Sequence, residues 1–156
     1  MSMQSADAID KMVFRKTNAH TGRHVAVTPA NSTMRHLSYG RIILNSSKPQ
    51  VSFSNGEQET GLICLSGNGV VKTEGNHFEL GQFDAVYIPR DSAIEVSTKS
   101  SVDFAEFSAD VKGKYALKLV RYAEVCKDPA MKFAAGSPGS RREFSDQSRM
   151  RESSLT

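Results

Sequence analysis

The sequence predicts an all-β fold, a single antiparallel barrel of the double-stranded β-helix or jelly-roll type. Three observations lead to this prediction. Short apolar or alternating runs recur between residues 23 and 122, and glycine, asparagine and proline separate them at the spacing of hairpins. Almost no segment has the 3.6-residue period of an amphipathic helix. A chain of 156 residues is filled by one such barrel, which leaves little room for a second domain.

The centre of the predicted barrel is the stretch 59–91, which is divided by glycines into four short strands. Its first apolar run, residues 61–65, is followed by Ser-Gly-Asn-Gly at residues 66–69, a sequence suited to the positive-φ positions of a tight hairpin. Glu74-Gly75-Asn76 is a second hairpin signal. The apolar run 84–88 is then ended by Pro89, because proline cannot donate to a sheet ladder.

Alternation predicts the remaining strands on both sides of this centre. They are expected at residues 13–15 as an edge strand, and at 23–28, 36–44, 50–54, 93–97, 102–107 and 115–122, with a turn or short helix at 123–129. The strand pattern also predicts which side chains face the core. These are Leu62, Cys64, Val70, Phe83, Val86, Ile88, Ile94, Phe104 and Leu119.

The composition along the chain predicts three segments. Residues 1–12 are polar and are expected to form a flexible N-terminal arm, and residues 13–133 form the barrel. Residues 134–156 are rich in serine, arginine and glycine without apolar periodicity, so we expect a linker-like disordered tail.

Charge and cysteine content exclude several classes of protein. The formal net charge is +3 and the basic residues are scattered, apart from four arginines near the C-terminus, which argues against a nucleic-acid partner. The two cysteines are far apart and lack metal-binding or disulfide-framework spacing. No apolar run approaches the ~20 residues of a membrane span, and the N-terminus lacks a signal-peptide pattern. We therefore expect a cytoplasmic protein without a membrane partner.

The order of strands and glycine turns resembles a cupin barrel. Metal-dependent cupins usually supply two histidines separated by one residue, a nearby carboxylate and a third histidine from a later strand. Where the first histidines would stand, this chain has Glu57 and Glu59 and no imidazole, and no histidine follows Pro89 within the next few residues. The four histidines present do not pair at ligand spacing; they are His20, His24, His36 and His77. We expect neither a metal nor another cofactor in this barrel.

Three segments carry a more specific resemblance. Residues 22–30 (GRHVAVTPA), 56–67 (GEQETGLICLSG) and 83–91 (FDAVYIPRD) are similar to the N-terminal cupin half of the 5-deoxy-glucuronate isomerase family, which is related to the 4-deoxy-5-ketouronate isomerases. The similarity covers roughly residues 13–125. It implies a two-barrel protein that isomerises aldoses to ketoses in inositol or uronate breakdown, with a divalent metal held in a C-terminal cupin that this chain does not contain.

Two hypotheses about function remain open. In the first, the chain is related to the isomerases in activity: Glu59 and Arg90 form a catalytic base and oxyanion stabiliser, while Arg23 and Glu57 bind a sugar-acid ligand. In the second, it is a catalytically silent cupin that acts as a structural, dimerising or small-ligand-binding module, and these charged side chains are a solvated rim. Either way we expect a homo-oligomer, because a lone barrel would expose the surface that its tandem partner covers.

Overall fold

The computed structural model describes residues 12–135 and 142–145 of the chain. Contacts between Cα atoms divide the chain into two compact units, Met1–Leu119 and Val120–Thr156. The first unit is the barrel and holds most of the strands that the sequence predicts.

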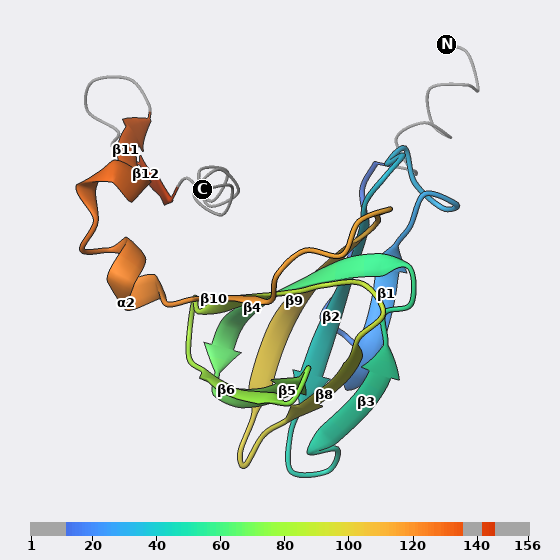
Figure 1. Cartoon of the computed structure of the whole chain (residues 1–156). Helices are drawn as coiled ribbons and strands as arrows, with labels where there is room; N and C mark the ends of the chain where they lie inside the picture. Colours follow the sequence, from blue (N-terminus) through green and yellow to red (C-terminus); the bar gives the residue numbers. More distant parts are fainter. Residues whose placement is uncertain (1–11, 136–141, 146–156) are drawn as a thin grey trace. The chain divides into compact units, whose positions relative to one another are not determined.

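Two antiparallel sheets make up the barrel (Figure 1). The larger has the strand order β1 (Gly22–Val27), β2 (Ser38–Leu44), β9 (Val102–Asp110), β4 (Gln58–Gly67), β7 (Ala85–Ile88) and β10 (Lys118–Val120). The smaller has the order β3 (Gln50–Ser54), β8 (Ala93–Ser97), β5 (Gly69–Thr73) and β6 (Asn76–Leu80). The predicted all-β, antiparallel fold class is confirmed.

The core lies between the inner faces of the two sheets, and strand alternation fills it. Along β2, for example, buried and half-buried residues alternate strictly, so every second side chain points inward. Both sheets contribute to the core cluster, which contains Ile42, Leu44, Leu62, Cys64, Val71, Leu80, Val86, Ile88, Ile94, Val96, Val102 and Phe104. Burial of these apolar side chains is the main stabilising contribution to the barrel.

The second predicted hairpin is present. Strands β5 and β6 pair antiparallel with Thr73 opposite Asn76, so Glu74 and Gly75 form a two-residue connection. Both have positive φ, 50° and 74°, as a type I′ turn requires. Asn55-Gly56, a residue pair typical of turns, lies in the connection between β3 and β4, where Gly56 has φ 53°.

The predicted hairpin at residues 66–69 is wrong. Strand β4 pairs with β7 and β9, whereas β5 pairs with β6 and β8, so the connection crosses from one sheet to the other. Gly67 has φ 74°, and a Cβ atom there would lie 2.2 Å from the Ser101 carbonyl oxygen. The glycine thus permits a close backbone crossing, a use that the local sequence does not distinguish from a hairpin.

Most of the predicted core is buried as expected, with three differences. Leu119 packs against the core while remaining partly exposed. Val70 is half-buried because its neighbour Val71, with no exposed surface, takes the inward position of β5. Phe83 is 46% exposed because it occupies the turn between β6 and β7 with φ 69°. A shift by one residue exchanges the two faces of a strand, which explains the error at Val70.

The ends of the chain differ more from the expectations. Residues 13–15 form no strand, and the predicted strand 115–122 is reduced to β10, followed by helix α2 (Tyr122–Val125). The second unit continues with the 3₁₀ helix η1 (Pro129–Met131) and strands β11 (Lys132–Ala135) and β12 (Arg142–Ser145), which pair antiparallel. Strand β11 begins in the range predicted for the barrel and ends in the range predicted for the tail, and β12 lies in the tail range. The rest of the tail, and residues 1–11 of the predicted arm, lie outside the described residues.

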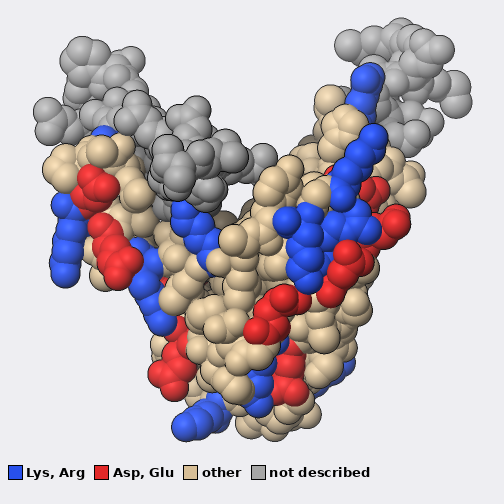
Figure 2. Space-filling model, viewed as in Figure 1, with Lys and Arg blue, Asp and Glu red and all other residues tan. Residues whose placement is uncertain are grey.

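No helix in the described part of the chain is long and apolar enough to span a membrane. Acidic and basic side chains are interspersed on the face drawn in Figure 2.

Candidate functional site

The barrel interior changes from apolar to polar along its strands. Across β2, β9 and β4, Ile42, Phe104 and Cys64 are register partners in one inward-facing row. Four residues along the same strands, the inward row is Ser38, Ser108 and Thr60. We define the polar end of the barrel as the buried, inward-facing polar residues Ser38, Thr60, Thr73, Glu106 and Ser108. It is the part of the interior with groups able to bind a polar molecule.

A buried carboxylate, Glu106, is the charged group of the polar end. Its side chain is 2% exposed and accepts three hydrogen bonds from Arg23 on β1: from Nε at 2.8 and 3.0 Å and from a terminal guanidinium nitrogen at 2.7 Å. The Arg23 Cζ atom also lies 4.0 Å from the ring centroid of Phe53 on β3, in a cation–π contact. Arg23 thus links a carboxylate of the larger sheet to an aromatic ring of the smaller one.

Sequence reasoning missed Glu106, although a signal for it was present. Phe104 was predicted to face the core, and in a strand the residue two positions further faces the same side. Extending the alternation of 102–107 would have placed Glu106 inside the barrel. Its partner could not be found this way, because Arg23 is 83 residues distant along the chain.

A hydrogen-bonded network joins the two sheets beside the polar end. The buried Asn55 amide donates to the Pro89 carbonyl at 2.8 Å and to Thr60 Oγ1 at 3.4 Å, and its oxygen accepts from the Ser92 backbone N–H at 2.8 Å. The Ser92 hydroxyl lies 3.0 Å from Glu74 Oε1. This network continues from β4 to the β5–β6 turn, so Thr60 and Thr73 belong to the same end of the barrel.

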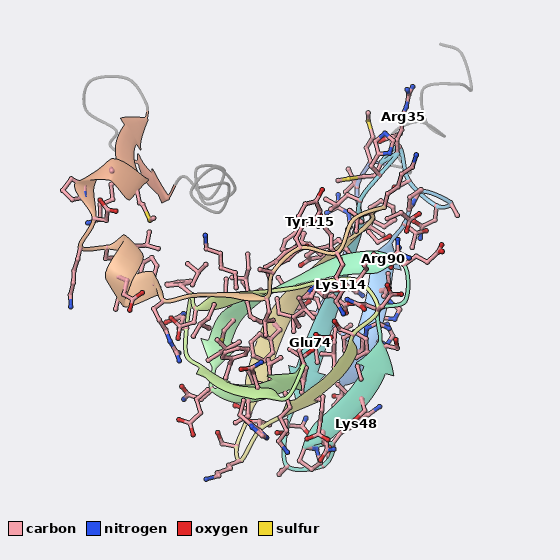
Figure 3. The ribbon with its side chains drawn as sticks, viewed as in Figure 1. Arg35, Lys48, Glu74, Arg90, Lys114 and Tyr115 are labelled. Atoms are coloured by element: carbon pink, nitrogen blue, oxygen red, sulfur yellow. The ribbon has the colours of Figure 1, made fainter. Side chains whose placement is uncertain are left out.

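Residues 111–117, which we call the mouth segment, are held at this end by charged side chains. Arg90 donates to the Val111 carbonyl at 2.5 Å, and Lys114 Nζ lies 3.2 Å from Glu74 Oε1. Lys114, followed by the Ser92 hydroxyl, lowers the pKa of Glu74 below its usual value. Figure 3 shows Arg90, Lys114 and Tyr115 at one end of the barrel and Lys48 at the opposite end.

The four predicted site residues are divided among three places. Arg90 and Glu57 approach each other at 3.7 Å, although Glu57 is 87% exposed and Arg90 also pairs with Asp91 at 2.9 Å. Arg23 pairs with Glu106. Glu59 stands on the outward side of β4, where its carboxylate accepts a hydrogen bond from the Tyr87 hydroxyl at 2.9 Å. A catalytic role for Glu59 with Arg90, and sugar-acid binding by Arg23 and Glu57, stay predictions.

The outward face of the larger sheet has its own contacts. Arg41 on β2 forms a two-point ion pair with Asp103 on β9, which raises the pKa of Arg41 above its ordinary value. The Tyr39 and Phe107 rings pack with centroids 5.3 Å apart. This face therefore combines apolar rings with an ion pair.

The donor groups present do not fit a transition-metal site. Among the described residues, no three His, Cys, Asp or Glu side chains gather where they could hold a metal ion. His20 and His24 stack with ring centroids 4.4 Å apart, but they are only two. Burial raises the pKa of the Cys64 thiol to about 11, so it remains protonated at neutral pH. We derive no metal-assisted step for this barrel, and its lack of a cofactor stays a prediction.

Comparisons with known proteins place the chain among related sequences and folds. A family model described as the KduI/IolB family matches residues 12–130. The structure is similar to that of an IolB-like protein from Salmonella typhimurium LT2, with 19% identity and a TM-score of 0.67 over 80% of this chain and 49% of that chain. The Escherichia coli protein Ylba gives 21% identity and a TM-score of 0.57 over 65% of this chain and 44% of that one.

The similarities extend to a cupin protein from Bacteroides fragilis, with 19% identity and a TM-score of 0.49 over 62% of this chain and 85% of that one. No curated protein sequence matches the chain. The chain spans about half the length of the IolB-like protein, whose likeness at this identity concerns the fold. The predicted all-β fold class is confirmed.

Proposed function

The chain belongs to the KduI/IolB family, and from this premise we propose that it is a catalytically silent cupin module of an isomerase-like protein. The family resemblance inferred from the sequence is confirmed. The interior of the barrel and the outer face of its larger sheet support two parts of this proposal.

The observation that carries the proposal is the ion pair between Arg23 and Glu106. Aldose–ketose isomerisation needs a base that accepts a proton and a group that stabilises the developing oxyanion. Glu106 is the carboxylate inside the barrel, yet it accepts three hydrogen bonds from Arg23. Both oxygens of this carboxylate are therefore occupied by the guanidinium, and the carboxylate could approach a substrate only by breaking these bonds. The pair therefore supports a structural role, in which it connects β1 and β9 and orders the interior.

The outer face of the larger sheet supports a second part of the same proposal, association with another copy of the chain. Tyr39, Ile43, Ile63 and Phe107 lie on this face and are only half-buried. A relative about twice as long has room for a second barrel of similar size. We propose that a second copy covers this face. Light scattering should give a dimer, and Phe107→Glu should give a monomer, whereas a monomeric parent chain at high concentration would contradict the proposal.

The test of catalytic silence is an isomerase assay on the purified full chain. A deoxy-uronate is incubated with the chain in the presence of zinc, manganese or iron, and the aldose and ketose forms are followed by NMR. We expect no turnover above the protein-free control. Turnover that Glu59→Gln or Arg90→Gln abolishes, while Glu95→Gln does not, would reinstate the enzyme hypothesis with the predicted catalytic pair.

A further inference from the structure

The outer face of the larger sheet has a gap in a row of aromatic side chains. The row consists of register partners on the outward sides of β2, β9, β4 and β7, which are Tyr39, Phe107, Gly61 and Tyr87. A Cβ atom added at Gly61 would have no atom of a non-neighbouring residue within 4 Å, so the space above this glycine is open. We call this space, between Phe107 and Tyr87, the Gly61 notch.

Contacts within the sheet fix the two walls of the notch. The Phe107 ring packs against the Tyr39 ring, on the side of β9 that faces away from Gly61, with the ring centroids 5.3 Å apart. The Tyr87 hydroxyl donates to the Glu59 carboxylate at 2.9 Å. The strands β9 and β7, which flank β4, lie about 10 Å apart, twice the usual spacing between neighbouring strands. The notch therefore has room for one further side chain between its walls.

Large and small side chains alternate along β9 and β4, the two middle strands of this six-stranded sheet. Their outward-facing register partners are Ala109 with Glu59, Phe107 with Gly61, and Ala105 with Ile63. Each pair joins a large side chain to a small one, and the large one changes strand from each pair to the next. The middle of the face therefore has protrusions on one strand opposite depressions on the other.

A second copy of the chain has the shape that fits this pattern. A twofold axis parallel to the strands, between β9 and β4, places β9 of each copy over β4 of the other. Phe107 of each copy then lies over the Gly61 notch of the other, and Ile63 lies over Ala105. Packed sheets keep their strand directions within about 30° of each other, so the rows nearest the axis stay in contact. Because the axis is central, the two faces overlap across their whole width.

The charges on this face are compatible with such contact. Arg41 is paired with Asp103, and the Glu59 carboxylate accepts the hydrogen bond from Tyr87. The two central register pairs that contain Phe107 and Ile63 carry no charged side chain. Burial of these rows therefore leaves no charge without a partner, which would otherwise oppose association.

We propose that the larger sheets of two copies pack face to face about this axis, with the Phe107 ring of each copy inserted into the Gly61 notch of the other. The inference rests on the association proposed above, and it specifies the symmetry axis and the side chain that fills the notch. An aromatic side chain that fills a pocket near the centre of an interface is the kind of contact that contributes most to affinity.

The first test is Gly61→Val, which fills the notch and leaves both walls in place. Gly61 has no positive φ and valine is favoured in strands, so the monomer, studied at low concentration, should melt at or above the temperature of the parent monomer. The dissociation constant of the dimer, measured by analytical ultracentrifugation, should rise about tenfold or more, because the partner's ring is excluded. The control Ser52→Val adds the same side chain at an exposed position of the smaller sheet and should dimerise like the parent.

The second test moves the ring from one middle strand to the other. Phe107→Ala alone and Gly61→Phe alone should each weaken the dimer, the first because the ring is lost and the second because two rings compete for one space. The axis exchanges positions 61 and 107, so the double variant Phe107→Ala/Gly61→Phe should recover most of the parent's affinity. If association depended on apolar area alone, Gly61→Val and Gly61→Phe would instead dimerise more tightly than the parent, which would overturn the proposal.

The outcomes separate this inference from the proposal on which it rests. A dimeric parent that becomes monomeric with Phe107→Glu, yet is unaffected by Gly61→Val, would overturn the insertion and keep association through this face. A monomeric parent would overturn both. If Gly61→Val lowers the melting temperature of the monomer, the swapped variant decides, and its failure to restore the dimer lost in Phe107→Ala would overturn the insertion.

Discussion

The two ends of the barrel interior lie on the same strands and differ in what they can do. At one end, Ile42, Phe104 and Cys64 form a fully buried apolar row. At the other, Ser38, Ser108 and Thr60 occupy the equivalent row, with Glu106 between the two rows. Burial of apolar side chains stabilises the fold whatever their exact orientation. At the polar end, each buried group must instead form a directional hydrogen bond with a defined partner. The same alternation therefore builds an apolar core at one end and a buried polar cluster at the other.

The largest effect is expected at the apolar end. Replacement of Phe104 by alanine should reduce the free energy of unfolding by about 3–5 kcal/mol, because a fully buried ring is removed and a cavity remains. Urea denaturation followed by circular dichroism measures this. Phe83→Ala is the matched control. Since Phe83 is 46% exposed, its replacement should cost less than about 1 kcal/mol, and similar losses for both variants would contradict the assignment of the apolar end.

At the polar end, removal of one member of the Arg23–Glu106 ion pair should reduce the free energy of unfolding nearly as much as Phe104→Ala does. Arg23→Gln leaves the buried Glu106 carboxylate without its partner, and we expect the free energy of unfolding to fall by about 3 kcal/mol. This value is at the lower end of the range for broken buried ion pairs, because the Arg23 side chain is 29% exposed. Glu106→Gln should cost less, because the remaining guanidinium can reach water. A double-mutant cycle measures the coupling. Equal losses for the two single variants would mean that Glu106 is not the buried partner.

The two cysteines offer a milder test of the apolar end. Cys64 is fully buried and its thiol pKa is raised to about 11, whereas Cys126 is partly exposed. At pH 8, a thiol reagent such as DTNB should modify Cys126 much faster than Cys64. Because the folded state holds the Cys64 proton more tightly, its contribution to stability is present below pH 9 and is lost as the pH rises toward about 11. Comparison with Cys64→Ala over this range isolates that contribution.

The smallest effect concerns the mouth segment. Glu74 has a lowered pKa, so its contact with Lys114 stabilises the segment above the usual glutamate pKa and is lost as the pH falls through the folded-state value. Glu74→Gln should accelerate amide hydrogen exchange in residues 111–117 at neutral pH without a measurable change in melting temperature. Glu95→Gln, which breaks the exposed pair with Lys72, should leave this exchange unchanged. Unaltered exchange in Glu74→Gln would show that Arg90 alone holds the segment.

Local patterns predicted much of the fold. Strands β3 and β8 have the bounds that alternation predicted, and the hairpin at Glu74-Gly75 follows from its residues. Side-chain alternation and positive-φ turns depend on neighbouring residues only, so a single sequence contains the information. The hairpin predicted at residues 66–69 was wrong because a hairpin and a crossing between sheets both need glycine at a positive φ. Only the pairing partners of β4 and β5 distinguish the two.

Less of the candidate site than of the fold could be predicted from the sequence. Glu57 was singled out because it stands where metal-dependent cupins have their first histidines, and Arg90 because a guanidinium can stabilise an oxyanion. The two side chains approach each other at 3.7 Å. Arg23 was singled out as a ligand-binding residue, yet its partner Glu106 went unnoticed within a strand that was otherwise correctly predicted. The Thr73 hydroxyl is buried without a hydrogen-bond partner among the described residues. This has no signature in the sequence, because the same threonine in an exposed position would be bonded to water.

The sequence by itself determined the all-β class, most strand positions and the family, because each depends on short-range periodicity or on the order of motifs along the chain. The tertiary structure alone decided which strands share a sheet, that Arg23 pairs with a carboxylate 83 residues away, and that Ser38, Ser108 and Thr60 form one row. These features depend on the register between strands distant in sequence. Register is decided by the total free energy of packing and hydrogen bonding across the barrel. No single segment of the sequence determines that total.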